Sequence, residues 1–335
     1  MYNPKKLLKN GLCAVSVVFA SSFMASFTHA EQIGMESATP NSLLGMFPQA
    51  MAPYWSKQGV DIQLSLNQTL TKSLLKIGQG SLDSAVIPPL AFTAMQKGVG
   101  PYAKMADKAK ALSENVRGLF TLPGSYYHAI TRADSGINTW ADARGKRVYI
   151  GPPAGAANSQ IISLAAAGGL AEGDYEAIKA PWGAAAQSYQ DGQFDVFVGT
   201  FSLGSQSLAE LSLSNDIRLL GVPGEKMIPP KGLGMQAAEI PANTYPGQVN
   251  TTSVLTWQTI MMMAVKKDLS DDIAYTLTKQ FVENRLALAK SNSLFNDLLT
   301  TDYFVGVNAP LHPGAVRYYR EAGIAIPEEL LPPQS

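Results

Sequence analysis

Cysteine and histidine are almost absent from this chain of 335 residues. The sequence holds one cysteine, Cys13, and three scattered histidines, His29, His128 and His312. One thiol can neither form an internal disulfide nor supply a cysteine-based zinc site, and three histidines far apart in the sequence are few for a histidine-ligated metal. We therefore expect no metal site.

A surplus of positive charge is also missing, because 26 Lys and Arg residues stand against 26 Asp and Glu residues. Without such a surplus the chain has little with which to neutralise a phosphate backbone, and nucleic-acid binding is disfavoured. The hydrophobic share of 46% and the charged share of 16% predict a folded chain with a sizeable core. Its length exceeds the size at which one core usually stops growing, which predicts two lobes.

The N-terminal segment has the pattern of an export signal. Lys5, Lys6 and Lys9 precede an uncharged apolar stretch, and Thr28-His29-Ala30 provides the small residues that signal peptidase requires before Glu31. A membrane anchor is the alternative, but the stretch is short and interrupted by serines. The mature chain is expected to begin at Glu31, to contain no cysteine, to carry 23 basic and 26 acidic side chains, and to reside in the periplasm.

Short apolar strands alternate with helical stretches in the first part of the mature chain. The predicted elements are strands over residues 32–35, 60–64 and 84–87 and helices over residues 45–59 and 70–77. Strands and helices that alternate at this spacing predict a parallel sheet with a ligand crevice at the carboxyl ends of its strands.

A second lobe is predicted after a strand over residues 116–120. Its predicted elements are strands over 127–132, 147–150 and 194–198 and helices over 138–142, 159–167 and 200–211. Residues 217–222 are predicted to return toward the first lobe. The predicted domains are a signal peptide over 1–30, lobe one over 31–120, lobe two over 121–222, and a return to lobe one with C-terminal helices over 223–335.

The acidic pair Asp271 and Asp272 could suggest acid–base chemistry. Both residues follow Ser270, a suitable N-cap, and Ile273 and Leu277 begin an apolar face with a spacing of four residues. Negative charge in the first turn of a helix interacts favourably with the helix dipole. The pair is therefore interpreted as the start of a core-packing helix.

Small residues follow the strand that ends at Ile150. The segment 151–159, GPPAGAANS, leads from that strand into a helix, whose free N–H groups could bind a carboxylate or another anion. A tight structural turn explains the same residues, and both readings stay open. The segment matches neither a phosphate loop nor a dinucleotide fingerprint, so no cofactor is expected.

Nucleophilic catalysis lacks a candidate, because the mature chain has no cysteine and no G-x-S-x-G turn. His128 and His312 are interpreted as structural. An exported enzyme on a two-lobed scaffold is the weaker alternative, and no enzymatic activity is expected. Polar loops over 37–42 and 67–71, with the neighbouring Lys72, could instead donate hydrogen bonds to a ligand, and Trp182 could form a cleft wall.

Several segments resemble the TAXI family of solute receptors, the substrate-binding subunits of TRAP transporters. The resemblance rests on HAITRADSGI over 128–137, WADARGKRV over 140–148, GPPAG over 151–155, LHPGA over 311–315 and IPEEL over 326–330. The chain departs from the family pattern in its first two polar loops and at Ala156, where the family has serine.

The resemblance implies a type II periplasmic binding-protein fold of the α/β class, with two lobes joined by a hinge and a ligand cleft between them. It implies an extracytoplasmic receptor, expected to be a monomer, that binds a small organic anion or amino acid such as glutamate or 2-oxoglutarate. The partners would be the membrane permease subunits of a TRAP transporter. The alternative is an ABC-type periplasmic binding protein for sulfonates, nitrate or a thiamine precursor.

The residues expected to bind the ligand come from both lobes. They are Thr39, Asn41, Ser42, Gln68, Thr69, Lys72, Ile87 and Pro88 in the first lobe, and Gly155, Ala156, Asn158, Ser159, Trp182 and Thr200 in the second.

Overall fold

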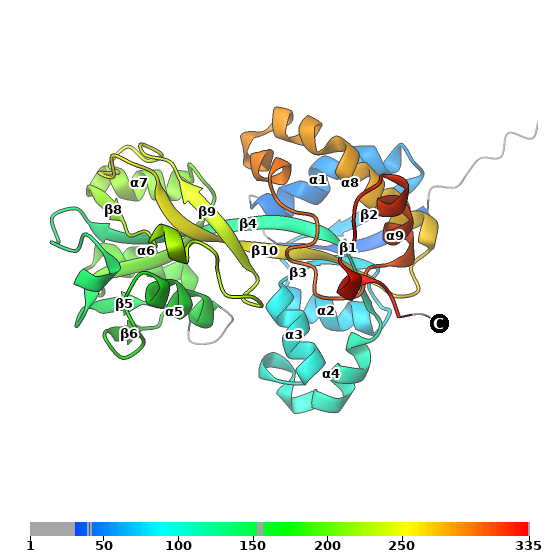
Figure 1. Ribbon diagram of the computed structural model, residues 1–335, viewed down its shortest axis with the longest axis horizontal. Coiled ribbons are helices and arrows are strands. Elements are labelled where there is room, and N and C mark those ends of the chain that lie inside the picture. The colour runs from blue at the N-terminus through cyan, green and yellow to red at the C-terminus, as the bar shows by residue number, and fades with distance from the viewer. Residues whose placement is uncertain (1–30, 39, 41, 153–156, 334–335) are drawn as a thin grey trace, which may run out of the picture.

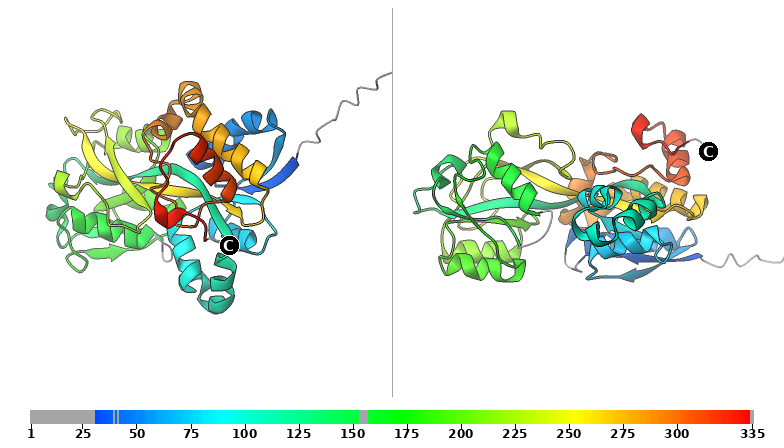
Figure 2. Two further views of the ribbon diagram at one scale, coloured as in Figure 1. Left: turned by 45° about the vertical axis from the view of Figure 1, so that its right-hand side comes forward. Right: turned by 90° about the horizontal axis from the view of Figure 1, so that it is seen from below.

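The structure, a computed structural model, describes residues 31–38, 40, 42–152 and 157–333. Figure 1 shows two bodies side by side, joined by the long strands β4 (Val116–Arg132) and β10 (Val254–Lys266). The turned views of Figure 2 show the same division. One ten-stranded sheet runs through both bodies in the order β2-β1-β3-β10-β4-β7-β5-β6, with β8 paired to β4 and β9 paired to β10.

The buried apolar side chains fall into separate clusters that match the two bodies. One large cluster contains residues from 33–122 and from 261–330, and two smaller clusters contain residues between 126 and 257. We call the body around the large cluster the first lobe and the body around the other two the second lobe. The α/β class predicted from the sequence is confirmed.

Three parallel strands and the two connecting strands form the sheet of the first lobe. The parallel strands are β1 (Glu31–Glu36), β2 (Val60–Ser65) and β3 (Ser84–Ile87). The α-helices are α1 (Leu43–Ser56), α2 (Leu70–Gly78), α3 (Pro89–Lys97), α4 (Ala106–Ser113), α8 (Asp271–Ser291) and α9 (Pro313–Glu321). Short 3-10 helices are η1 (Gly100–Met105), η4 (Ser293–Leu299) and η5 (Glu328–Leu330). In Figure 1, α1 and α8 lie on one side of this sheet, and α2, α3 and α4 lie on the other.

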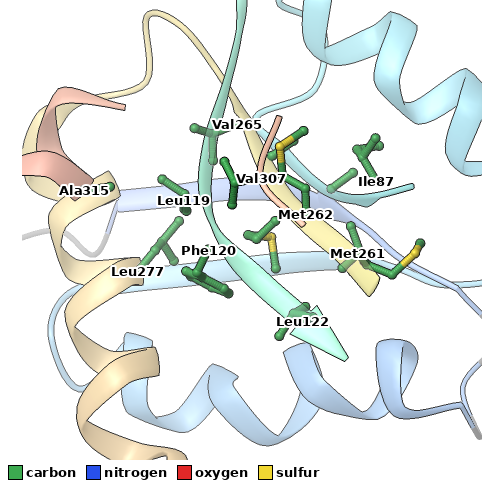
Figure 3. Close-up of a cluster of buried hydrophobic side chains, with 14 of the residues drawn as sticks. Ile87, Leu119, Phe120, Leu122, Met261, Met262, Val265, Leu277, Val307 and Ala315 are labelled. Atoms are coloured by element: carbon green, nitrogen blue, oxygen red, sulfur yellow. The ribbon is translucent and has the colours of Figure 1, made fainter. Parts of the chain in front are cut away.

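Aromatic rings tie α8 to the sheet in the first lobe. The rings of Phe120 and Phe281 stack with centroids 3.9 Å apart and planes 19° apart, and Phe47 meets Phe281 edge-on at 5.5 Å. Figure 3 shows Phe120, Leu277 and Met262 in this core beside β4 and β10. The predicted apolar face of Ile273, Leu277 and Phe281 is buried, as expected for a core-packing helix.

The second lobe continues the sheet with parallel strands. They are β5 (Arg147–Tyr149), β6 (Glu176–Ile178) and β7 (Val196–Phe201), and the lobe also contains β8 (Ile217–Leu219) and β9 (Met235–Ile240). The helices are α5 (Ala157–Ala167), α6 (Trp182–Gln190), α7 (Gln206–Ser214), η2 (Trp140–Ala143) and η3 (Gly224–Lys226). Side chains of β4 alternate between two cores, because Tyr127 packs with α5 and Tyr126 packs with α6 and α7.

The connection between the lobes differs from the sequence prediction. Residues 116–120 and 127–132 were expected to be separate strands, and they are the two ends of the continuous strand β4. The strand continues through Pro123 and Gly124. The pairing between β4 and β10 shifts register at these residues, and this β-bulge accommodates them. Such a bulge tolerates a proline and leaves room for the Thr259 side chain, which fills the space above Gly124.

The chain also returns to the first lobe later than expected. Residues 217–222 were predicted to lead back, but β8 pairs with the far end of β4, where Leu219 lies opposite Ile130. Met235, Ile240 and Trp257 are buried in the clusters of the second lobe. The return runs along β10, so residues 235–257 pack with the second lobe, whereas the predicted boundary at 222 had assigned them to the first. Among the helices of the described chain, none is both long and apolar enough to cross a membrane.

Candidate functional site

Two cavities lie where the lobes meet, and side chains of both lobes line each of them. The first, which we call the Pro88 cavity, measures about 170 Å³ and is lined by Pro88, Pro89, Leu90, Gln160, Gly234, Thr259, Ile260 and Met261. The second, the Asp297 cavity, measures about 180 Å³ and is lined by Leu43, Gly124, Tyr126, Ser202, Leu203, Ser293, Leu294, Asn296 and Asp297. Both adjoin the bulge in the two connecting strands, through Gly124 and Thr259.

The Pro88 cavity joins the start of α3 to the second lobe. Pro88 and Pro89 open this helix, and neither has an N–H group, so fewer backbone donors are available to an anion here than at an ordinary helix start. Gln160 is buried, with its Oε1 accepting from the Tyr127 hydroxyl at 2.7 Å and its Nε2 donating to the Leu233 carbonyl at 2.8 Å. The amide is thus held in one orientation beside the cavity.

The Asp297 cavity contains a fixed carboxylate. Asp297 Oδ1 accepts a hydrogen bond from the Tyr126 hydroxyl at 2.8 Å, and Oδ2 accepts one from Gln258 Nε2 at 2.8 Å. Burial and the Asp297 carboxylate raise the pKa of Tyr126 far above its usual range, so the phenol stays protonated and donates. Because Asp297 belongs to η4 of the first lobe and Tyr126 to a core of the second, this bond links the lobes.

The predicted binding residues of the first lobe lie near the carboxyl ends of its strands, but they have different surroundings. Ser42 is the N-cap of α1 and accepts from the Gly45 N–H at 3.2 Å, while Gln68 Nε2 donates to the Leu66 carbonyl at 2.9 Å. Thr69, at the N-cap of α2, and Lys72, in its first turn, are exposed. These side chains stay candidates for ligand contact.

Two further residues of the first lobe follow β3. Ile87 is fully buried in the core and lies opposite Met262 in the sheet, so its side chain packs inside the lobe rather than against a ligand. Pro88, the next residue, lines the cavity between the lobes. Thr39 and Asn41 lie outside the described residues.

The predicted residues of the second lobe also follow strand ends. Asn158 Nδ2 donates to the Ile150 carbonyl at 2.5 Å and to the Pro152 carbonyl at 3.1 Å, so this side chain is bonded to the backbone just after β5. Ser159 lies in the first turn of α5, and Thr200 is half-buried in β7. Gly155 and Ala156 lie outside the described residues.

Trp182 opens α6 and leaves 41% of its surface exposed, although its ring meets Tyr149 edge-on at 5.7 Å. An exposed indole at the carboxyl end of β6 is available to a ligand. Trp182 stays a candidate for the cleft wall.

Several residues that line the cavities were not anticipated from the sequence. Ser202 and Leu203 directly follow the end of β7, two and three residues beyond Thr200, and Gln160 lies one residue beyond Ser159, so a wider reading of the same loops could have included them. Asp297 carries no such local signal. Within the described part of the chain, no group of three or more His, Cys, Asp or Glu side chains could hold a metal ion.

A model of the NMT1-like family matches residues 51–323 of this sequence, which is more than half of the chain. The chain belongs to the NMT1-like family. The arrangement of two α/β lobes described above is a periplasmic binding-protein fold, which a solved periplasmic binding protein shares. The predicted fold class is confirmed.

Solved structures of low sequence identity resemble this NMT1-like protein. A putative sulfonate ABC transporter protein, the periplasmic sulfonate-binding protein SsuA from Methylobacillus flagellatus, has a TM-score of 0.52 at 10% identity, covering 88% of this chain and 86% of its own. The periplasmic aliphatic sulphonate-binding protein SsuA from Escherichia coli has a TM-score of 0.48 at 12% identity, with coverages of 87% and 83%. An extracytoplasmic solute receptor from Bordetella pertussis, DctP7, which binds pyroglutamic acid, has a TM-score of 0.43 at 14% identity, with coverages of 88% and 92%.

Proposed function

We propose that this NMT1-like protein is a periplasmic solute receptor that works by binding rather than by catalysis. It would bind a small anionic or zwitterionic organic solute, a carboxylate such as glutamate or 2-oxoglutarate, and deliver it as a monomer to the permease of a TRAP-type transporter. The observation that carries the proposal is that both cavities at the lobe junction are lined by residues from the two lobes.

A ligand in such a position couples binding to lobe movement. Contacts with Pro88 on one side and Gln160 on the other are formed together only when the lobes approach. A ligand that makes more contacts in the closed arrangement shifts the population toward it by its difference in affinity. The bulge at Gly124 and Thr259 is a suitable place for the required change of angle, because regular pairing between β4 and β10 is interrupted there.

The linings of the cavities favour holding the carboxylate of the solute mainly through dipoles. Neither cavity is lined by Lys or Arg among the residues that the structure describes, and Asp297 contributes a negative charge to one of them. We propose that the carboxylate of the solute is held by N–H groups at the start of α5, with hydroxyl groups and the exposed Lys72 beside it. An α-ammonium group would face Asp297, which favours a zwitterion over a simple anion.

A thermal-shift screen of the refolded chain from Glu31 onward tests the proposal. The panel contains glutamate, glutamine, 2-oxoglutarate, other dicarboxylates, sulfonates and short aromatic acids. A solute at one hundred times its Kd stabilises the folded chain by about 2.7 kcal/mol, which corresponds to about 4 °C in Tm for a chain of this size. A shift with glutamate or 2-oxoglutarate is the expected result.

Variants connect such a shift to the site. Lys72→Gln should lower affinity without lowering the Tm of the ligand-free protein, because the side chain is exposed. Trp182→Ala should also lower affinity, and the Tm of the ligand-free protein should fall slightly because the contact with Tyr149 is lost. Lys104→Gln, at an exposed lysine of η1, is the matched control and should leave affinity unchanged. A shift produced by sulfonates alone would reassign the solute class. A panel that produces no shift at all would contradict the proposed carboxylate ligand.

The transporter class needs a separate measurement. Proteoliposomes that contain the permease and receive this receptor should accumulate solute when an ion gradient is imposed, without ATP. Uptake that requires ATP and ignores the gradient would assign the receptor to an ABC transporter instead.

A further inference from the structure

A third cavity lies in the first lobe, away from the junction of the lobes. It is formed by the start of β4, the segment after β10, helix α9 and residues 331–333, and it measures about 840 Å³. Arg117, at its inner end, is nine residues before Tyr126 along the same strand, which corresponds to about 30 Å. Figure 1 shows α9 and the C-terminal segment on the side of the first lobe that faces away from the second lobe.

Positive charge dominates the lining of this cavity. Arg117, Lys267, Arg317 and Arg320 line it together with one acidic residue, Glu321. Arg317 is paired with Asp272, its Nη2 lying 2.7 Å from Oδ1. For Arg117, Lys267 and Arg320 no carboxylate lies within salt-bridge distance in the described ranges of the chain, so these three charges are unpaired and Glu321 is the one acidic residue in the same lining.

Arg117 is the most informative of these residues because it is buried, with 7% of its surface exposed. Its Nη1 donates to the carbonyls of Glu114 and Val116, both at 2.8 Å. The guanidinium has three further N–H donors on Nε and Nη2, and the residue lines the cavity. An arginine keeps its proton at physiological pH, so burying it without an opposite charge is costly unless an anion binds there.

We propose that this cavity binds a phosphate group, which the free donors of Arg117 hold in bidentate geometry while Lys267 and Arg320 neutralise charge at the rim. Arginine is suited to this role because its planar fork matches two oxygens of a phosphate. The apolar side chains of Val316 and Leu331 line the same cavity and would contact a hydrocarbon portion of the ligand. The phosphate group can therefore belong to a free solute or to the headgroup of a lipid.

Two binding experiments on the mature chain distinguish these sources. Isothermal titration with inorganic phosphate at 150 mM NaCl detects binding of the free anion. Co-sedimentation with phosphatidylglycerol vesicles, compared with phosphatidylcholine vesicles, detects binding of an anionic headgroup. Saturable binding in either arm supports the site and identifies the source. Absence of binding in both arms overturns the proposal.

Variants place the binding in the cavity. Arg320→Gln and Lys267→Gln change exposed side chains and should each weaken binding about tenfold, because charge-assisted hydrogen bonds are lost. Arg117→Lys keeps the positive charge but lacks the planar guanidinium that can bind two oxygens at once, and it should also weaken binding. Far-UV circular dichroism verifies that this variant is folded. Lys104→Gln is the control with one exposed charge removed elsewhere on the first lobe.

If Lys104→Gln and Arg320→Gln lower the affinity for phosphate or anionic vesicles equally, the binding is a non-specific electrostatic attraction. That result would overturn the proposed phosphate site. The thermal shift caused by a solute in the cleft between the lobes should be the same in all of these variants. The outcome is therefore independent of the proposed receptor function.

Discussion

Acid should destabilise this protein through His128, which lies fully buried in the second lobe. Its Nδ1 donates to the Tyr126 carbonyl at 3.0 Å, and its Nε2 accepts from the Tyr245 hydroxyl at 2.8 Å. Both ring nitrogens are therefore occupied in the neutral form, and a second proton, on Nε2, would force the Tyr245 hydroxyl to change from donor to acceptor. Burial lowers the pKa of His128 from 6.5 to about 4.

The size of the effect follows from that pKa. The unfolded chain takes up a proton on this histidine near pH 6.5, whereas the folded chain does so only near pH 4. Between these values the unfolded state binds more protons, so stability falls as the pH falls. Each unit of pKa difference corresponds to 1.36 kcal/mol, and between pH 7 and pH 4 the loss is about 3 kcal/mol.

Urea denaturation of the wild type and of His128→Gln at pH 7, 5 and 4 measures this loss. The variant is less stable at pH 7, because the ring loses its packing against Phe201 and Tyr245. The decrease in unfolding free energy from pH 7 to pH 4 should nevertheless be about 3 kcal/mol smaller in the variant. Contributions from His312 and the carboxylates are shared and cancel in the comparison. An equal decrease in both proteins would refute the reasoning.

Three further substitutions test the packing and the link between the lobes. Phe281→Ala removes a ring from the aromatic cluster of the first lobe and should cost about 3–5 kcal/mol, measured by urea denaturation. Gly168→Ala would place a methyl group 2.0 Å from Cδ1 of the buried Trp140, so the Tm should fall by several degrees, and an unchanged Tm would contradict this contact. Tyr126→Phe removes the hydrogen bond to Asp297 and should lower the unfolding free energy by about 1.5–3 kcal/mol, whereas a neutral result would show that the bond contributes little.

The strands of the first lobe were predictable because their signals are local. Residues 60–64 alternate apolar and polar side chains after Gly59, residues 84–87 are a mostly apolar run that ends before Pro88, and the two segments form β2 and β3. The continuity of β4 was not predictable in this way. Pro123 and Gly124 read as a stop signal, and what carries the strand across them is pairing with Thr259 and Ile260, more than one hundred residues later.

In the candidate site too, local sequence signals predicted only part of what the structure shows. Pro88 was anticipated because it follows a buried strand, and it lines a cavity. Ile87, one residue earlier, has the same sequence signal but is buried in the core, because it is the last residue of β3, whereas Pro88 lies beyond the strand at the start of α3. Asp297 lies in a short helix far from any predicted loop, and its place at the lobe junction depends on Tyr126 and Gln258.

The division of the core has a consequence for the order in which the lobes can form. The clusters of the second lobe use one contiguous stretch, residues 126–257, whereas the cluster of the first lobe needs residues 33–122 together with 261–330. During synthesis from the N-terminus, the second lobe can fold before Phe281, the stacking partner of Phe120 in the first lobe, has been made. During that interval apolar surface of the first lobe is exposed, which is the condition under which chaperones are needed. A chain that ends at residue 260 would keep the second lobe complete and leave the first one open.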